Sequence, residues 1–307
     1  MAGALGTINS TTSILETSDK GANNGVASLD GSGNVPLSQL GNAPSGATRN
    51  NYVLVKAKSD LPTPVTGVIT LADNTSYEIN GTIALGTDRI VCGVSNIIYG
   101  VDKSNDILTY TGTGNMITST NQDLTISKIT CVATGVGSAI FACTGTNNNI
   151  EIAENIFANS KSVGTIGGGF DILVFRNNLV TACDDGITIA GTNLDLIITD
   201  NLFNALTSTC TAVRITGTAI YHTAIISRNM FEIAATQTGL DISAGISFTG
   251  GGIIEGNVFE DGGTYLATIN ANSPDWIIKA GTNVGLPGLL ELTIGVANQV
   301  SSTTAKY

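Results

Sequence analysis

The sequence is poor in basic and aromatic residues, and this shortage narrows the classes of partner. Only 13 of 307 residues are lysine or arginine, scattered along a chain whose formal net charge is −11, and aromatics make up 5%. A protein that binds DNA or RNA needs a basic stripe to neutralise phosphates. We therefore expect no nucleic-acid partner, and the same shortage disfavours adhesion to an anionic membrane.

Long apolar runs are also missing. No window of 18 or more apolar residues exists, so we expect no membrane insertion. The opening stretch "MAGALGTINSTTSILETSDKGANNG" lacks the basic region and the long apolar segment of a secretory signal. The glycine runs at 167–169 and 250–252 do not follow a strand-to-helix turn, so we expect no phosphate cradle and no cofactor.

The cysteines do not form a metal or disulfide pattern. They are odd in number, widely spaced and without a CxxC pair, so we expect no metal site and no disulfide framework. Free buried thiols in a chain folded in cytosol are the expected state. The residues concerned are Cys92, Cys131, Cys143, Cys183 and Cys210.

The polarity of the chain comes from small residues. Charged residues are 12% of the sequence, against about 25% in an average soluble domain, while apolar residues reach 42% and glycine alone numbers 37. Serine, threonine and asparagine compete with helical hydrogen bonds, and glycine weakens helices. The composition therefore favours strands joined by tight turns over helices.

A six-residue pattern returns along the middle of the chain. It consists of an apolar residue, two variable positions, asparagine and two apolar residues, and its copies are "IAENIF" (152–157), "FRNNLV" (175–180), "ITDNLF" (198–203), "ISRNMF" (226–231) and "IEGNVF" (254–259). A degenerate copy, "ISKITC", occupies 126–131, and alternating runs that end in Gly-Thr lie between the copies. Self-similarity at this period marks a repeat architecture.

Each unit of about 25 residues holds short alternating runs and no helical period, which predicts one rung of a right-handed, single-stranded parallel β-helix. Stacked rungs place equivalent residues above one another, about 4.8 Å apart. The asparagines are then expected at a sharp corner, in the left-handed conformation that asparagine tolerates, with their amides bonded in a ladder. They are Asn155, Asn178, Asn201, Asn229 and Asn257.

Two inward columns follow from the same stacking. The first contains Ile152, Phe175, Ile198, Ile226 and Ile254, and the second contains Phe157, Val180, Phe203, Phe231 and Phe259. Three segments result: an N-terminal arm at 1–50 with too few large apolar residues for a core, a parallel β-helix at 51–287 whose first rungs lie at 67–90, and a C-terminal cap or tail at 288–307. About nine rungs would give a rod of about 40 Å.

Two segments carry a family resemblance. "KGANNGVASLDGSGNVPLSQLG" (20–41) resembles an element of phage tail-fibre and tail-spike proteins, and "VKAKSDLPTPVTGVITLADNTSYEINGTIAL" (55–85) resembles the opening of pectin-lyase-like β-helix modules of phage virions. The resemblance implies a virion protein, assembled in the host cytoplasm as a homotrimer. Its residues 1–50 would bind other virion proteins of tail, baseplate or capsid, and the β-helix would be displayed to a host-surface glycan or receptor.

The β-helix superfamily that the chain resembles includes polysaccharide-cleaving enzymes, which makes the acidic residues the candidates for catalysis. Glycoside hydrolysis needs two carboxyl groups about 5–9.5 Å apart, and the weak candidates are Asp184, Asp185 and Asp200. Polygalacturonase-like enzymes order their motifs as Asn-Thr-Asp, Asp-Asp, His-Gly and Arg-x-Lys. In this chain "DDG" (184–186) precedes "TDN" (199–201) and His222 is followed by threonine, so no catalytic residue is carried over.

A turn explains these acids better than a catalytic site does. "CDDG" (183–186) and "FEDGG" (259–263) occupy equivalent loops, where glycine supplies a positive φ. Candidate glycan contacts are then Asp184, Asp185, Glu260 and Asp261. We expect a non-enzymatic tail fibre or spike that attaches to the host surface. The alternatives are a capsular polysaccharide depolymerase, hydrolase or lyase, with a site between subunits, and a capsid decoration or head fibre protein.

Overall fold

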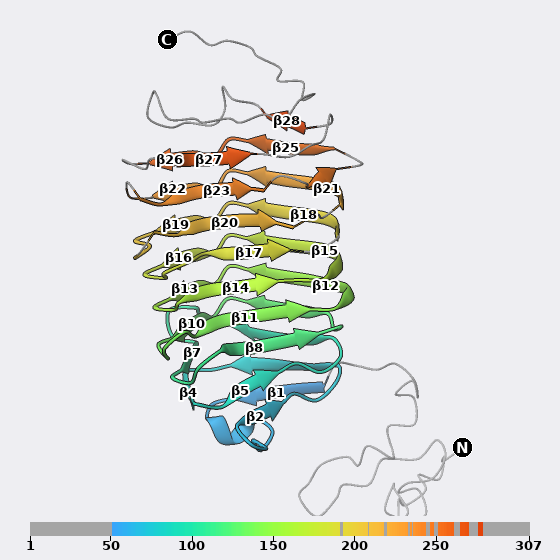
Figure 1. Ribbon diagram of the computed structural model, residues 1–307. Helices are drawn as coiled ribbons and strands as arrows, with labels where there is room; N and C mark the ends of the chain where they lie inside the picture. Colours follow the sequence, from blue (N-terminus) through green and yellow to red (C-terminus); the bar gives the residue numbers. More distant parts are fainter. Residues whose placement is uncertain are drawn as a thin grey trace, which may run out of the picture. The chain divides into compact units, whose positions relative to one another are not determined.

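The computed structural model describes residues 51–190, 193–207, 209–217, 220–232, 234, 236–243, 246–248, 251–260, 265–269 and 276–278. Within them, short parallel strands form three sheets that wind around one core as a right-handed parallel β-helix (Figure 1). The all-β solenoid predicted from the repeat is therefore confirmed. The predicted arm at 1–50 and the predicted tail at 288–307 lie outside the described residues, and their boundaries stay predictions.

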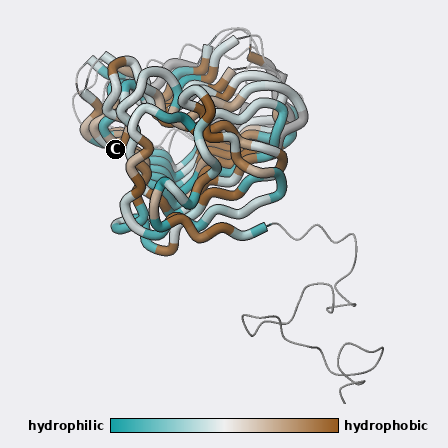
Figure 2. Tube along the Cα trace, turned by 90° about the horizontal axis from the view of Figure 1, so that it is seen from below, coloured by the Kyte–Doolittle hydropathy of each residue, from teal (hydrophilic) through white to brown (hydrophobic). Residues whose placement is uncertain are grey.

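We name the longest sheet, which has 11 strands, sheet I. In the rungs that contain a repeat asparagine, the chain enters the corner of asparagines from this sheet. Seen along the solenoid, the strands of successive rungs stack behind one another (Figure 2). The strands are β1 (Asn51–Val55), β3 (Thr75–Ile79), β6 (Asn96–Gly100), β9 (Leu124–Ser127), β12 (Thr146–Ala153), β15 (Gly169–Arg176), β18 (Asn193–Thr199), β21 (Ile220–Ser227), β24 (Ser247–Phe248), β25 (Gly252–Glu255) and β28 (Trp276–Ile278).

Sheet II follows the corner and has eight short strands. They are β4 (Thr82–Gly86), β7 (Ile107–Tyr110), β10 (Thr130–Ala133), β13 (Ile156–Ala158), β16 (Leu179–Thr181), β19 (Leu202–Asn204), β22 (Met230–Glu232) and β26 (Val258–Glu260).

Sheet III completes each rung and has nine strands. They are β2 (Val68–Thr70), β5 (Arg89–Val91), β8 (Asn115–Thr120), β11 (Ala139–Thr144), β14 (Ser162–Ile166), β17 (Ile187–Ala190), β20 (Thr211–Thr216), β23 (Thr238–Ile242) and β27 (Tyr265–Ile269). A 3-10 helix, η3 (Lys58–Asp60), precedes β2, and Leu61 after it is buried at 5% exposure in the first rung.

Both predicted inward columns are present. The residues of the first column, from Ile152 to Ile254, pair in register along sheet I and are at most 2% exposed. Those of the second column, from Phe157 to Phe259, pair in register along sheet II and are at most 4% exposed. Because every rung repeats the same path, a position in the repeat is also a position in space.

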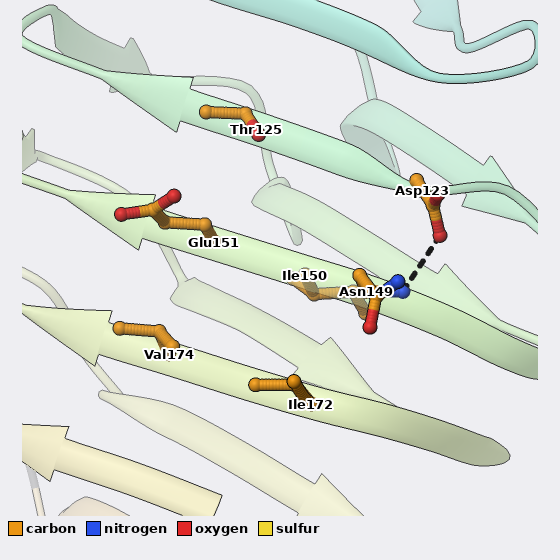
Figure 3. A pocket seen from close by; sticks show the side chains of 7 residues that line it. All are labelled: Asp123, Thr125, Asn149, Ile150, Glu151, Ile172 and Val174. Atoms are coloured by element: carbon orange, nitrogen blue, oxygen red, sulfur yellow. Dashed lines mark hydrogen bonds between the residues drawn. The ribbon is translucent and has the colours of Figure 1, made fainter.

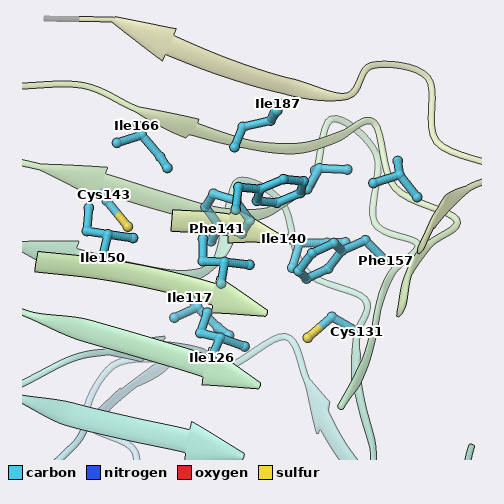
Figure 4. Close-up of a cluster of buried hydrophobic side chains, with 14 of the residues drawn as sticks. Ile117, Ile126, Cys131, Ile140, Phe141, Cys143, Ile150, Phe157, Ile166 and Ile187 are labelled. Atoms are coloured by element: carbon cyan, nitrogen blue, oxygen red, sulfur yellow. The ribbon is translucent and has the colours of Figure 1, made fainter. Parts of the chain in front are cut away.

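At one rung a phenylalanine of sheet I fills the space left by a smaller residue of sheet II. Where sheet II has the smaller Val180, sheet I of the same rung has Phe175, whose ring stacks between Phe157 at 6.1 Å and Phe203 at 6.3 Å. Stacked rings then continue from rung to rung across the two columns. Figure 4 shows the adjoining core, where isoleucines and cysteines surround Phe141 and Phe157. The five cysteines are free and buried, as predicted.

Candidate functional site

The corner between sheets I and II is held by a ladder of buried amides. Each asparagine of the repeat donates from its side-chain Nδ2 to the Oδ1 of the next, at 2.9–3.1 Å. The same Oδ1 accepts the backbone N–H of the previous asparagine at 3.0–3.1 Å. Since all five side chains are at most 2% exposed, the predicted ladder is a structural element of the core.

The left-handed residue of the corner is not the asparagine, which corrects the sequence-based expectation. The positive φ belongs to the residue before it, for example Glu154 at 62°, Asn177 at 54°, Asp200 at 59° and Arg228 at 55°. The bend at that residue turns the following asparagine inward, where its amide spans two rungs. The residue that bends is solvent-facing, so acidic, basic and neutral side chains all occur there.

Asp200 therefore lies on the outer edge of the corner. The Arg228 guanidinium of the next rung binds its carboxylate through two nitrogens, each at 2.7 Å. These bonds hold the pKa of Asp200 below its usual range. Arg176 similarly binds Glu151 at 2.8 Å. The Asp200 carboxylate is therefore a poor general acid, because it stays ionised at neutral pH.

Asp184 lies at the other end of sheet II, in the loop between β16 and β17. It accepts hydrogen bonds from Thr207 and from Lys161, the latter at 3.0 Å, and both lower the pKa of its carboxyl group. The structure thus places Asp184 and Asp200 at different corners of the β-helix and does not bring them together as a catalytic pair. Asp184 links three successive rungs on the surface.

Asp185 has a local structural contact. Its carboxylate accepts the backbone N–H of Thr211 at 3.0 Å. Asp184 and Asp185 lie in a bend between β16 and β17, and the positive φ of 51° belongs to Ala182 and not to Gly186. Glycine is needed at 186 for another reason: a Cβ there would collide with the carbonyl oxygen of Ala212 in the next rung.

A hollow of about 540 Å³ borders Asp184. Polar side chains and the loop at 134–137 line it, and Val136 in that loop is 90% exposed. Lys161, with 57% of its side chain exposed, carries the positive charge of the hollow. Hydrogen-bond donors and acceptors beside an apolar group are the features that a polar ligand such as a sugar would contact.

A second hollow, of about 270 Å³, lies on the outer face of sheet I (Figure 3). Asp123 accepts the backbone N–H of Asn149 at 2.7 Å on one side of it. Glu151, Ile172 and Val174 continue the lining, and Ile172 is 43% exposed. Apolar atoms form most of the lining of this hollow, whereas they form about half of the lining of the hollow beside Asp184.

One carboxyl group that the sequence analysis did not select has a raised pKa. Asp241 faces outward on β23, and its desolvation raises the pKa while Arg214, at 3.7 Å, partly opposes the rise. Its neighbours along the same row of sheet III are Arg214 and the backbone of Thr268. Strand alternation places Asp241 outward, but only the three-dimensional packing produces the desolvation.

The remaining candidates do not add a second acid. Glu260 ends β26, in register with Glu232, whereas Asp261 lies outside the described residues. His222 contacts Asp195 at 3.5 Å on the exposed face of sheet I. In the described part of the chain, no group of three or more His, Cys, Asp or Glu could hold a metal ion, and no helix has the length and hydropathy to cross a membrane.

Comparisons with known proteins give no relative. No family model, no curated protein and no solved structure matches this chain. The physical features of the β-helix therefore carry the functional argument. The carboxylates of Asp184 and Asp200 are each bound to side chains of neighbouring rungs.

Proposed function

We propose that this chain is a structural protein of a virus particle, a phage tail fibre or spike that attaches to the host surface as a homotrimer without cleaving the receptor. The observation that carries the proposal is the single stacked core, with side chains aligned rung over rung from sheet to sheet. Such a core gives a stiff shaft that is suited to display. The residues that resemble fibre proteins, at 20–41 and 55–85, favour the same class.

The contact with a host glycan is assigned to the hollow beside Asp184. Lys161 and Asp184 are both partly exposed there and already bind each other at 3.0 Å. Sugar hydroxyls can replace water around such a pair, donating to the carboxylate and accepting from the ammonium group. The low pKa of Asp184 keeps its carboxylate an acceptor at neutral pH.

The test measures binding of the purified full-length protein to host-surface polysaccharide by surface plasmon resonance. We expect Asp184→Asn and Lys161→Ala to weaken binding at least tenfold. The matched control is Asp88→Asn, which also breaks an ion pair, with Lys58, but at residues that do not line the hollow. Unchanged binding by both hollow variants would reject this assignment.

The same incubations distinguish attachment from depolymerisation. Reducing ends and unsaturated products are measured after the protein has been mixed with the polysaccharide. We expect neither, and release of oligosaccharide would replace the proposal with the depolymerase. Labelled antibody imaging of intact particles then separates a tail protein from a capsid decoration protein.

A further inference from the structure

An outward aliphatic column runs along sheet II. In every full copy of the repeat, the first apolar residue after the asparagine points away from the core, because its neighbour along the strand points inward. These residues pair in register and are all partly exposed. We call them the sheet II column: Ile156, Leu179, Leu202, Met230 and Val258.

Sheet I has an outward column of its own. It begins on the rung that follows Glu151 in the chain. Its residues again pair in register and are partly exposed. Ile172, beside its first member, widens the apolar surface (Figure 3). We call this set the sheet I column: Val174, Ile197, Ile225 and Ile253.

The two columns flank the same corner, and the charges between them are already paired. Arg228 binds Asp200 there, and Arg176 binds Glu151. A protein that approaches this edge would therefore meet these four charges as two ion pairs. The outer face of sheet III differs, because its row contains threonines such as Thr165 and Thr188 and then the charges of Arg214 and Asp241.

The spacing of the columns identifies their occupant. A partner that covers either column must present apolar groups about every 4.8 Å over four or five rungs. A second parallel β-helix in the same orientation has this repeat, and this chain provides one. Parallel copies bring equivalent levels together, and no member of either column is charged.

The presence of two different columns fixes the type of contact. A surface that binds a different surface on an identical copy makes a head-to-tail contact, which forms a ring when the rotation between copies closes and an open filament when it does not. One column is a strip only about 20 Å long, whereas a stable interface buries about 800 Å² per partner. Each copy in a ring uses both strips and the sheet faces around them, which doubles the area buried per copy.

We propose that copies of this chain associate side by side with parallel axes, the sheet I column of one copy packing against the sheet II column of the next, and that the ring closes at three. This inference rests on the trimer of the proposed function and adds the surface that forms it. The corner of asparagines then points toward the threefold axis, and sheet III faces outward.

Light scattering after gel filtration tests the surface. We expect wild-type protein at three times the chain mass of 31.4 kDa. Leu202→Glu places a charge in the sheet II column and should give the monomer, with an unchanged β-sheet circular dichroism spectrum. Thr188→Glu, an outward substitution on sheet III beside Arg214, should leave the trimer intact. A trimer that withstands Leu202→Glu overturns the inference.

Cysteine crosslinking tests the pairing of unlike columns, since the native cysteines are all buried. A mixture of the single variants Ile197→Cys and Leu202→Cys should form interchain disulfides under mild oxidation, and either variant alone should not. Crosslinking in a single variant means that like columns meet and overturns the head-to-tail geometry.

The experiment also separates this inference from the proposed function. A wild-type monomer overturns the inference and the proposed trimer together. If the thiol introduced at position 202 of that monomer resists alkylation, a segment of the same chain covers the column instead. Binding to host polysaccharide is measured on the same samples, so loss of attachment and loss of the interface are read independently.

Discussion

Replacing one asparagine in the middle of the ladder should destabilise the β-helix strongly. Asn201 donates to the carbonyl oxygen of Phe175 and to Oδ1 of Asn229, each at 2.9 Å. Its own Oδ1 accepts the backbone and the side-chain N–H of Asn178, each at 3.0 Å. Asn201→Ala removes all four hydrogen bonds from a site that is 2% exposed. At about 1 kcal/mol net for each bond, the loss is about 4 kcal/mol.

The measurement is denaturant unfolding followed by circular dichroism, at one fixed protein concentration because association adds to apparent stability. The control is Asn177→Ala, one residue away on the exposed side of the corner at a φ of 54°. It removes no ladder bond and should cost only about 1 kcal/mol, from the poorer fit of alanine to the left-handed region. Equal losses in the two variants would refute the ladder argument.

Three further predictions use the same surface and core. Burial raises the pKa of the Cys143 thiol to about 12, so native protein at pH 8 should resist iodoacetamide. All five cysteines should react only after unfolding, as counted by mass spectrometry. Labelling of the folded chain would contradict the burial. Gly186→Ala should lower the unfolding midpoint, because its Cβ meets a carbonyl of the next rung, whereas Gly167→Ala, with no atom within 4 Å of its Cβ, should not. Arg228 lowers the pKa of Asp200, so the ion pair should stabilise the folded state above the unfolded carboxyl pKa of about 3.9. Asp200→Asn should remove this stabilisation, and the difference in unfolding free energy from wild type should disappear as pH falls through the lower folded pKa. A difference that persists at pH 2 would contradict the ion pair.

The positions of the outward columns show how far strand alternation alone can lead. The pattern of asparagine and two apolar residues placed Phe203 in the core, and alternation along the same strand sends Leu202 outward. The repeat pattern alone predicted only the inward residue. The register of successive rungs then made the outward residues a continuous column.

The acids could be placed only in part from the sequence. Their position in a loop followed from Asp-Gly, since turns favour these residues. Their contacts did not, because Asp184 binds residues 23 positions away on either side. The lengths of the loops between rungs vary, so the residue that lies opposite a loop side chain depends on the packed structure.

The sequence by itself determined the winding of the chain and the two inward columns from Ile152 and Phe157. In a solenoid, translation along the axis converts a sequence period into spatial contact, so the repeat contains the core. Only the tertiary structure decided which corner residue is left-handed, where the Phe175 ring fills the gap at Val180, and which carboxyl groups are ionised or desolvated. These features depend on side-chain directions and distances between rungs, and a period in the sequence does not specify them.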